Sequence, residues 1–141
     1  IYAGDRKIAG MLIESSISGS RIEFVIVGIG INFNQEKFDP SIPNPVSLRM
    51  LTGKNYPVEE LLETFLTNLS GELSAIYCGK FDDVELKYSS SQYKLNIPSD
   101  FLLHRQKIRA TVTGIDPLGR LLLQTDDGKE LAVSEKEIIY C

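Results

Sequence analysis

The sequence predicts an α+β protein in two parts. Residues 1–97 combine apolar, β-branched strand segments with one long amphipathic helix, whereas residues 98–141 hold short strands separated by turn residues. We therefore place a domain boundary near Pro98, with a first domain of residues 1–97 and a second of residues 98–141. Short strands at this spacing are typical of small barrels, so we expect an SH3-like β-barrel in the second domain.

A β-hairpin is expected at the start of the chain. Residues 7–13 are mostly apolar and predict a strand buried on both faces, and residues 22–31 predict a second strand with only Glu23 interrupting its apolar run. Residues 14–21 have turn composition and should connect the two. The opening residues 1–5 are typical of the tip of a turn and lack a starting methionine, so we expect a chain cut at a loop.

Lysine, glycine and asparagine residues mark one end of this hairpin. Because side chains alternate along a strand, Gly28, Gly30 and Asn32 share a face. If the register sets Lys7 opposite Gly28 or Gly30, the glycines leave a hole beside the lysine. A lysine among apolar residues is costly to bury unless it meets an anion, although a strand-end lysine also reaches water easily. Glycine in a strand marks a bulge or the close approach of another group, and Asn32 suits the capping of a loop as well as the edge of a base.

The remaining elements follow in order. Residues 33–45 predict a polar, proline-rich surface loop, and residues 46–53 a short helix that ends at Gly53. Residues 57–77 are the clearest helix, with a proline at its first position and apolar residues at helical spacing, which predicts a face packed on the core. One more short helix is expected within residues 79–93. Strands are predicted at 107–116, 120–125 and 130–134, with an Asp-Gly hairpin turn before the last.

The composition argues against several functions. The net charge is −4 and no block of Lys and Arg appears, so nucleic-acid binding is not expected. One histidine and two distant cysteines, Cys78 and Cys141, support neither a metal site nor a Ser-His-Asp triad, and they favour a reducing cytoplasm. No apolar run approaches the roughly 20 residues that span a bilayer, so no membrane association is expected. The oligomeric state stays open, with a homodimer among the options.

Two motifs carry a family resemblance. The segments Asp5-Arg-Lys-Ile-Ala-Gly-Met-Leu-Ile-Glu14 and Val27-Gly-Ile-Gly-Ile-Asn-Phe-Asn34 closely resemble the paired motifs of the biotin protein ligases (biotin–acetyl-CoA-carboxylase ligases). The resemblance covers essentially the whole chain, although the residues after about 79 match in layout more than in motif. It implies the C-terminal part of a biotin/lipoate-ligase-like catalytic domain, a mixed sheet with helices, followed by the SH3-like module.

The resemblance also implies an activity. Enzymes of this family activate biotin with ATP, supplied with Mg²⁺, to biotinyl-5′-AMP, and transfer biotin to a lysine of the biotin carboxyl carrier protein of acetyl-CoA carboxylase. By resemblance, Lys7 is the catalytic group and contacts the biotin carboxylate and the phosphate. The other implied contacts are Gly10, Gly28 and Gly30 for biotin, and Met11 and Asn32 for the adenine of ATP.

Part of the family's pattern does not occur in this sequence. The Gly-Arg-Gly-Arg loop and the Lys-Trp-Pro-Asn-Asp segment are both absent, so we expect that residues 1–141 alone cannot make biotinyl-AMP. Two alternatives stay open for the function, namely a lipoate-ligase-like acyl-adenylate transferase and a non-catalytic binding remnant. Two functions also stay open for the C-terminal module. It either packs as a cap on the catalytic domain or helps to bind ATP or the carrier protein.

Overall fold

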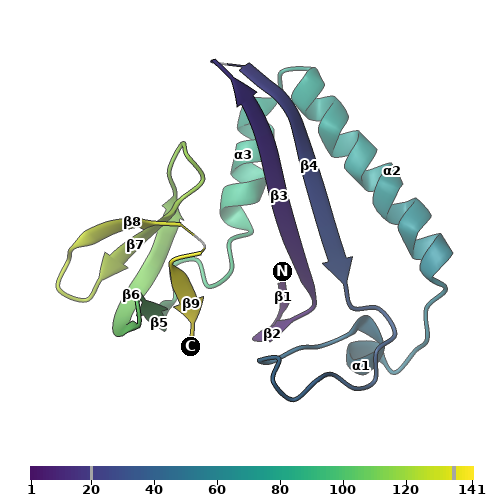
Figure 1. Ribbon diagram of the computed structural model, residues 1–141, viewed down its shortest axis with the longest axis horizontal. Coiled ribbons are helices and arrows are strands. Elements are labelled where there is room, and N and C mark those ends of the chain that lie inside the picture. The colour runs from purple at the N-terminus through teal and green to yellow at the C-terminus, as the bar shows by residue number, and fades with distance from the viewer. Residues whose placement is uncertain (20, 135) are drawn as a thin grey trace. The chain divides into compact units, whose positions relative to one another are not determined.

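A computed structural model of the chain describes residues 1–19, 21–134 and 136–141 and has the predicted α+β composition (Figure 1). Its contacts divide it into two compact units, residues 1–69 and residues 70–141, and the division falls inside the longest helix. The domain boundary that the sequence places after residue 97 lies within the second unit and stays a prediction for the C-terminal sheet. The strand ladders are all antiparallel, and parallel pairing among the described residues is confined to two isolated bridges.

The predicted hairpin is present, but its ends differ from those expected. Two very short strands, β1 (Tyr2–Ala3) and β2 (Arg6–Lys7), pair around the predicted turn at the start of the chain. The long hairpin follows as β3 (Ala9–Ser18) and β4 (Arg21–Ile31). The turn predicted over residues 14–21 is therefore wrong for most of its length. The polar residues there continue the ladder as far as Ser18, and the Ser16 hydroxyl donates across the strands to the Glu23 carboxylate at 2.9 Å.

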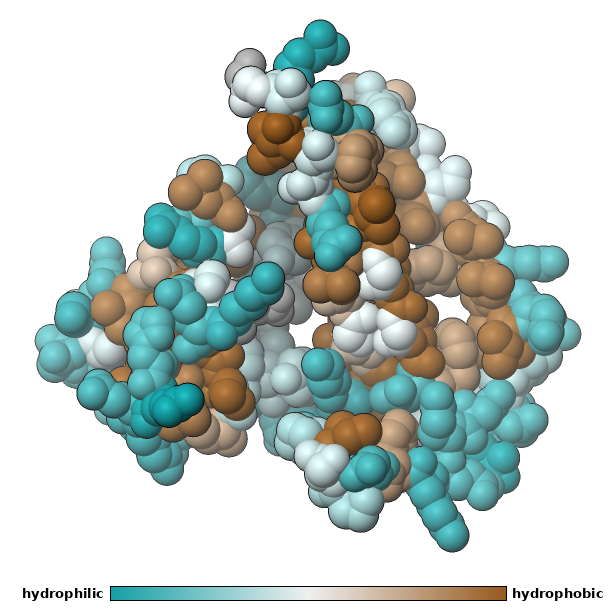
Figure 2. Space-filling model, viewed as in Figure 1, coloured by the Kyte–Doolittle hydropathy of each residue, from teal (hydrophilic) through white to brown (hydrophobic). Residues whose placement is uncertain are grey.

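The apolar side chains of this hairpin are exposed, so the prediction of a strand buried on both faces is wrong for the residues that the structure describes. Met11 and Ile13 lie on one face with Val27, and they are 53%, 63% and 49% exposed. Leu12 and Ile26 lie on the other face and are each 58% exposed. Figure 2 shows apolar surface over the region of the hairpin. Two bare faces of this size are typical of a sheet whose covering layers come from other polypeptide segments.

The short helix α1 (Leu48–Thr52) confirms the predicted end at Gly53 and begins two residues later than the predicted start at residue 46. The Ser47 hydroxyl caps it by accepting the Met50 N–H at 3.1 Å, and Gly53 ends it in the left-handed region at a φ of 72°. Ser47 is completely buried together with Val46, and its hydroxyl also donates to the Gln35 carbonyl. These two buried residues fix the end of the proline-rich loop next to the hairpin.

The two longer helices are also where the sequence places them. They are α2 (Val58–Tyr77) and α3 (Phe81–Ser90), and α2 carries Glu59 and Glu60 in its first turn. Neither helix buries a residue among the described part of the chain, so the core packing predicted for α2 is not seen there. Its apolar stripe is between 37% and 52% exposed and consists of Leu62, Leu66, Leu69, Leu73 and Ile76.

The C-terminal part forms one five-stranded sheet. Its strands stand in the order β8-β7-β6-β5-β9, with bounds β5 (Pro98–Leu103), β6 (Gln106–Ile115), β7 (Leu121–Thr125), β8 (Glu130–Val133) and β9 (Ile138–Tyr140). The sequence predicts β6, β7, β8 and the turn containing Gly128, but it misses β5 and β9. No ladder joins β8 to β9 among the described residues, so this sheet does not close, and the SH3-like barrel stays a prediction.

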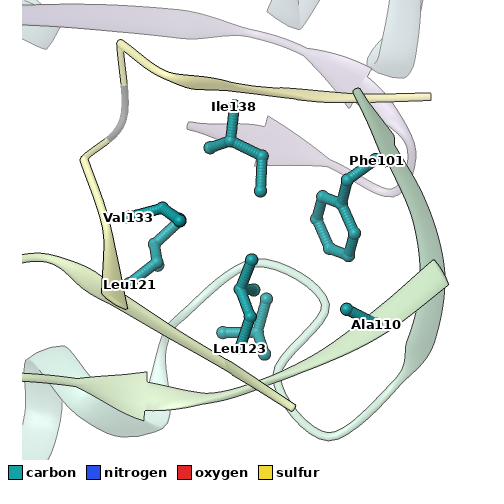
Figure 3. Close-up of a cluster of buried hydrophobic side chains, with 7 residues drawn as sticks. Phe101, Ala110, Leu121, Leu123, Val133 and Ile138 are labelled. Atoms are coloured by element: carbon teal, nitrogen blue, oxygen red, sulfur yellow. The ribbon is translucent and has the colours of Figure 1, made fainter. Parts of the chain in front are cut away.

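This sheet contains the main hydrophobic core (Figure 3). Phe101 on β5 and Leu123 on β7 are at most 1% exposed, and Figure 3 shows their side chains turned toward the same interior. Seven buried residues form the cluster, namely Phe101, Ala110, Val112, Leu121, Leu123, Val133 and Ile138. All five strands contribute to it, so the sheet curves around its own core.

A surface carboxylate on this sheet makes its stability depend on pH. Lys107 and Arg109, both on β6, lie 3.3 Å from the Asp100 carboxylate on β5, and they hold the pKa of Asp100 below its ordinary value, Lys107 most strongly. A lowered pKa means that this stabilisation is present above the unfolded pKa of about 3.9 and is lost as the pH falls through the folded pKa. We expect Asp100→Asn to destabilise the sheet near neutral pH, and the difference from the wild type to disappear as the pH falls through the lowered pKa of Asp100. Urea titrations of both proteins across this range test the expectation, and a difference that does not change with pH would contradict it.

Candidate functional site

Lys7 lies outside the long hairpin ladder. It pairs with Tyr2 on β1, and on its other side it forms an isolated parallel bridge with Pro45 of the proline-rich loop. The register considered above, with Lys7 opposite Gly28 or Gly30, does not occur, because the strand is interrupted at Ile8 and β3 begins only at Ala9.

The Lys7 side chain nevertheless reaches the glycine face. Gly10 pairs directly with Gly30 in the hairpin ladder. A Cβ added at Gly10 would lie 3.6 Å from Cε and 3.8 Å from Nζ of Lys7, so the lysine runs across the surface that Gly10 leaves bare. A Cβ added at Gly30 would meet nothing within 4 Å. The two opposed glycines thus leave open space next to an exposed ammonium group.

A pocket of about 200 Å³ opens at this place. The hairpin end supplies Lys7, Ala9, Gly10, Gly30 and Asn32, and the proline-rich loop supplies Phe38, Ile42 and Pro45. The sequence singled out the lysine, both glycines and the asparagine, but it missed the three loop residues. Their only signal is that they are apolar residues in an otherwise polar loop, and nothing in the sequence says where such a loop folds back.

Two other predicted site residues do not line this pocket. Gly28 pairs with Leu12, on the same face as Gly30 but further along the hairpin. Met11 pairs with Ile29, and strand alternation puts that pair on the face opposite to the Gly10–Gly30 pair. The structure therefore brings Lys7, Gly10, Gly30 and Asn32 together and leaves Gly28 and Met11 outside the group.

Asn32 has a structural role at the pocket wall. Its Nδ2 donates to the Val46 carbonyl at 3.1 Å and to the Lys7 carbonyl at 3.4 Å. Its backbone N–H donates to the Ile8 carbonyl at 2.9 Å, and its own carbonyl accepts the Leu48 N–H at 2.9 Å. Asn32 thus joins the end of β4 to the lysine segment and to the end of the proline-rich loop. Of the two roles that the sequence allows for Asn32, these contacts are those of a residue that caps a loop.

These contacts define what the pocket can hold. One wall carries an ammonium group, a second lacks side-chain bulk, and the third is formed by apolar loop residues. A ligand with an anionic group beside an apolar body suits this combination. A larger hollow of about 490 Å³ lies nearby in the same unit, but none of its five lining residues, Ile31, Phe33, Asn34, Gln35 and Val58, carries a charge.

The described residues show neither a metal centre nor a membrane-spanning helix. No group of three or more His, Cys, Asp or Glu side chains is placed to bind a metal ion in the described part of the chain. Within the same residues, every helix is too short or too polar to cross a lipid bilayer.

Comparison with known proteins adds family information to this geometry. Residues 101–140 match the family model described as the biotin protein ligase C terminal domain. A biotin–[acetyl-CoA-carboxylase] ligase of Paracoccus denitrificans is 26% identical over 129 residues, which cover 89% of this chain and 54% of that protein.

Solved structures agree with the sequence match. The apo structure of biotin protein ligase from Aquifex aeolicus is 26% identical with a TM-score of 0.73, and the match covers 99% of this chain and 61% of that one. The complex of the Aquifex aeolicus ligase with biotin and ATP matches with a TM-score of 0.72 over 99% of this chain and 58% of that one. The chain thus spans between 54% and 61% of the length of these three relatives. Taken together, these matches show that the chain is similar over almost its whole length to biotin protein ligases, and that its residues 101–140 resemble their C-terminal domain.

Proposed function

We propose that the protein to which this chain belongs is a biotin–[biotin carboxyl carrier protein] ligase, and that the Lys7 pocket is part of its biotin and ATP site. The observation that carries the proposal is the Lys7 ammonium lying across Gly10, next to the Gly10–Gly30 pair, in a pocket with apolar loop residues. Biotin carries its carboxylate at the end of an apolar alkyl chain, so this end of the molecule matches the charged and apolar walls of the pocket.

The first half-reaction explains why a fixed ammonium is needed. A biotin carboxylate oxygen attacks the α-phosphorus of ATP, the new O–P bond forms, and the bond to pyrophosphate breaks. Negative charge from the carboxylate and the α-phosphate meets at this junction, so the Lys7 ammonium stabilises the transition state more than the separate substrates. Gly10 and Gly30 allow the reacting groups to lie against the backbone, and Asn32 holds the pocket wall in place.

The second half-reaction needs the carrier protein. A lysine amine of the biotin carboxyl carrier protein attacks the activated carbonyl of biotinyl-AMP, an amide forms, and AMP leaves. In this proposal Mg²⁺ enters on the phosphates of ATP, the reaction takes place in the cytoplasm, and residues 1–141 by themselves do not complete it. The contacts proposed for Gly28 and Met11 would require a ligand that extends beyond the pocket described above.

Calorimetric titration of the full natural protein with biotin, lipoate and biotinyl-AMP separates the candidate functions. The proposal expects biotin and biotinyl-AMP to bind and lipoate to bind far more weakly. Preferential binding of lipoate would support the acyl-adenylate transferase alternative, which shares the fold and chemistry. The absence of binding by all three compounds to the folded protein would leave the non-catalytic alternative.

Substitution of the pocket glycines tests the site itself. Gly30→Ala adds a methyl group that meets no protein atom within 4 Å, so the protein should fold normally while the pocket loses space. We expect biotin to bind at least about fivefold more weakly, since forced overlap costs about 1–3 kcal/mol. Gly71→Ala in α2, which also meets no atom within 4 Å, is the neutral control.

Gly28→Ala measures the extent of the same site. Its added Cβ meets only the Leu12 carbonyl oxygen at 3.9 Å, and Gly28 is not a pocket-lining residue. A small change in biotin affinity would mean that biotin lies within the pocket. A loss of affinity equal to that of Gly30→Ala would mean that biotin extends along the hairpin as far as Gly28. Unchanged biotin binding by Gly30→Ala would remove the pocket from the proposal.

A further inference from the structure

The segment 44–46 runs beside Lys7 and supplies most of the hydrogen bonds to its backbone. The Lys7 N–H donates to the Asn44 carbonyl at 2.8 Å, and the Lys7 carbonyl accepts the Val46 N–H at 3.0 Å. The other bond to that carbonyl comes from Asn32 Nδ2 at 3.4 Å, which is longer and weaker. Lys7 is therefore held mainly by the end of the proline-rich loop rather than by the long hairpin.

Asn44 forms hydrogen bonds with both sequence neighbours of Arg6, namely Asp5 and Lys7. Its backbone carbonyl binds Lys7, and its side-chain Nδ2 donates to the Asp5 carbonyl at 2.7 Å. Its backbone lies in the left-handed region at a φ of 41°, which asparagine tolerates better than most residues with a side chain. One residue thus fixes both ends of the three-residue stretch that leads from the turn into Lys7.

The anchoring of this stretch decides where the Lys7 ammonium lies. The lysine stem is flexible, the side chain is exposed, and β2 contains only two residues. The strand is also interrupted between Lys7 and β3, so Lys7 lies outside the long ladder and is linked to the hairpin through the bonds of Asn32 to the Lys7 and Ile8 carbonyls. The bonds from Asn44 remove the freedom of the stretch before Lys7 and so keep Nζ above Gly10.

We propose that Asn44 is a positioning residue for Lys7, which acts by holding residues 5–7 so that the lysine ammonium points at the Gly10–Gly30 pocket. This inference rests on the proposed function, because it assumes that Lys7 contacts the reacting carboxylate and phosphate. A misplacement of about 1 Å is enough to cost up to about a hundredfold in rate when a catalytic group must be aligned.

The test compares variants of the full natural protein by their rates of biotinyl-AMP formation. Asn44→Gly keeps the left-handed backbone accessible but removes the donor to Asp5, so the fold should be retained. We expect kcat to fall about tenfold or more with little change in the KM for biotin, because alignment is lost and not the pocket. Ser41→Gly is the matched control, since Ser41 lies in the same loop and its hydroxyl donates to Asp39 instead of to the stretch before Lys7.

A double-mutant cycle separates positioning from general loosening. If Asn44 acts through Lys7, Asn44→Gly should change the residual rate less than about twofold in a Lys7→Ala background. A full additional loss in that background, an equal loss in Ser41→Gly, or no loss in the wild-type background would overturn the role of Asn44 while leaving the proposed function intact. If Lys7→Ala itself has no effect on the rate, the proposed function fails first, and the role of Asn44 fails with it.

Discussion

Lys7→Ala is expected to abolish most of the biotinyl-AMP formation by the full natural protein while leaving its fold intact. The Lys7 side chain is exposed, so its truncation should change the free energy of unfolding by no more than about 0.5 kcal/mol. Its ammonium is the only charged group among the residues that line the described pocket, so no neighbour there can replace it. Removing one preorganised charge-stabilising donor typically lowers kcat by about a hundredfold or more. Single-turnover formation of biotinyl-AMP, measured together with thermal unfolding, tests both halves of this expectation.

A second exposed lysine provides the control for this variant. Lys54 lies in the same unit, just after α1, and does not line the pocket. Lys54→Ala removes the same charge from the same unit and should keep the wild-type rate. Equal activity of Lys7→Ala and the wild type, at matched folded fraction, would take Lys7 out of the catalytic role.

Phe101→Ala is expected to have the largest effect on stability. Phe101 is completely buried at the centre of the C-terminal core, and its ring packs against Tyr140 with a centroid separation of 5.0 Å. Its strand β5 stands between β6 and β9, so a cavity there weakens two ladders at once. Truncation of a buried phenylalanine costs about 3–5 kcal/mol, a large share of the stability of an ordinary domain.

Chemical denaturation followed through the C-terminal sheet checks this value. Leu118→Ala is the matched control, because Leu118 lies between β6 and β7 and is 79% exposed, so its truncation should cost less than about 0.5 kcal/mol. A loss below about 1 kcal/mol for Phe101→Ala would mean that the cluster in Figure 3 is not the core that stabilises this sheet.

The sequence predicts those parts of the fold that depend on local chemistry. The left-handed Gly53 and the helical spacing after Pro57 mark where α1 ends and where α2 runs, and Gly128 in the Asp-Gly turn marks the β7–β8 hairpin. The strands β5 and β9 are missed because neither alternates clearly over its few residues, and both are defined by partners distant in sequence. The same limit explains the exposed hairpin. Apolar composition reports that a strand prefers burial, but not which segment covers it.

The candidate site was predictable in its residue types but not in its geometry. Alternation groups Gly30 with Asn32, and the structure places both residues with Lys7 around the described pocket. The register between them stayed open, because the interruption at Ile8 has no mark in the sequence. This interruption puts Met11 on the face opposite to the one that the Lys7 side chain reaches. The contribution of Phe38 and Asn44 was missed for a further reason. Their positions follow from a loop that returns to Lys7 through backbone hydrogen bonds, and backbone bonds leave almost no pattern in side-chain chemistry.

The most direct test of the central claim is to incubate the full natural protein with biotin and ATP and to measure biotinyl-AMP by mass spectrometry and pyrophosphate release in parallel. We predict equal amounts of both products, formed only when biotin is present and reduced at least about a hundredfold in Lys7→Ala. Pyrophosphate release that requires lipoate instead of biotin, or a folded protein that forms no biotinyl-AMP under these conditions, would contradict the assignment of the Lys7 pocket to biotin activation.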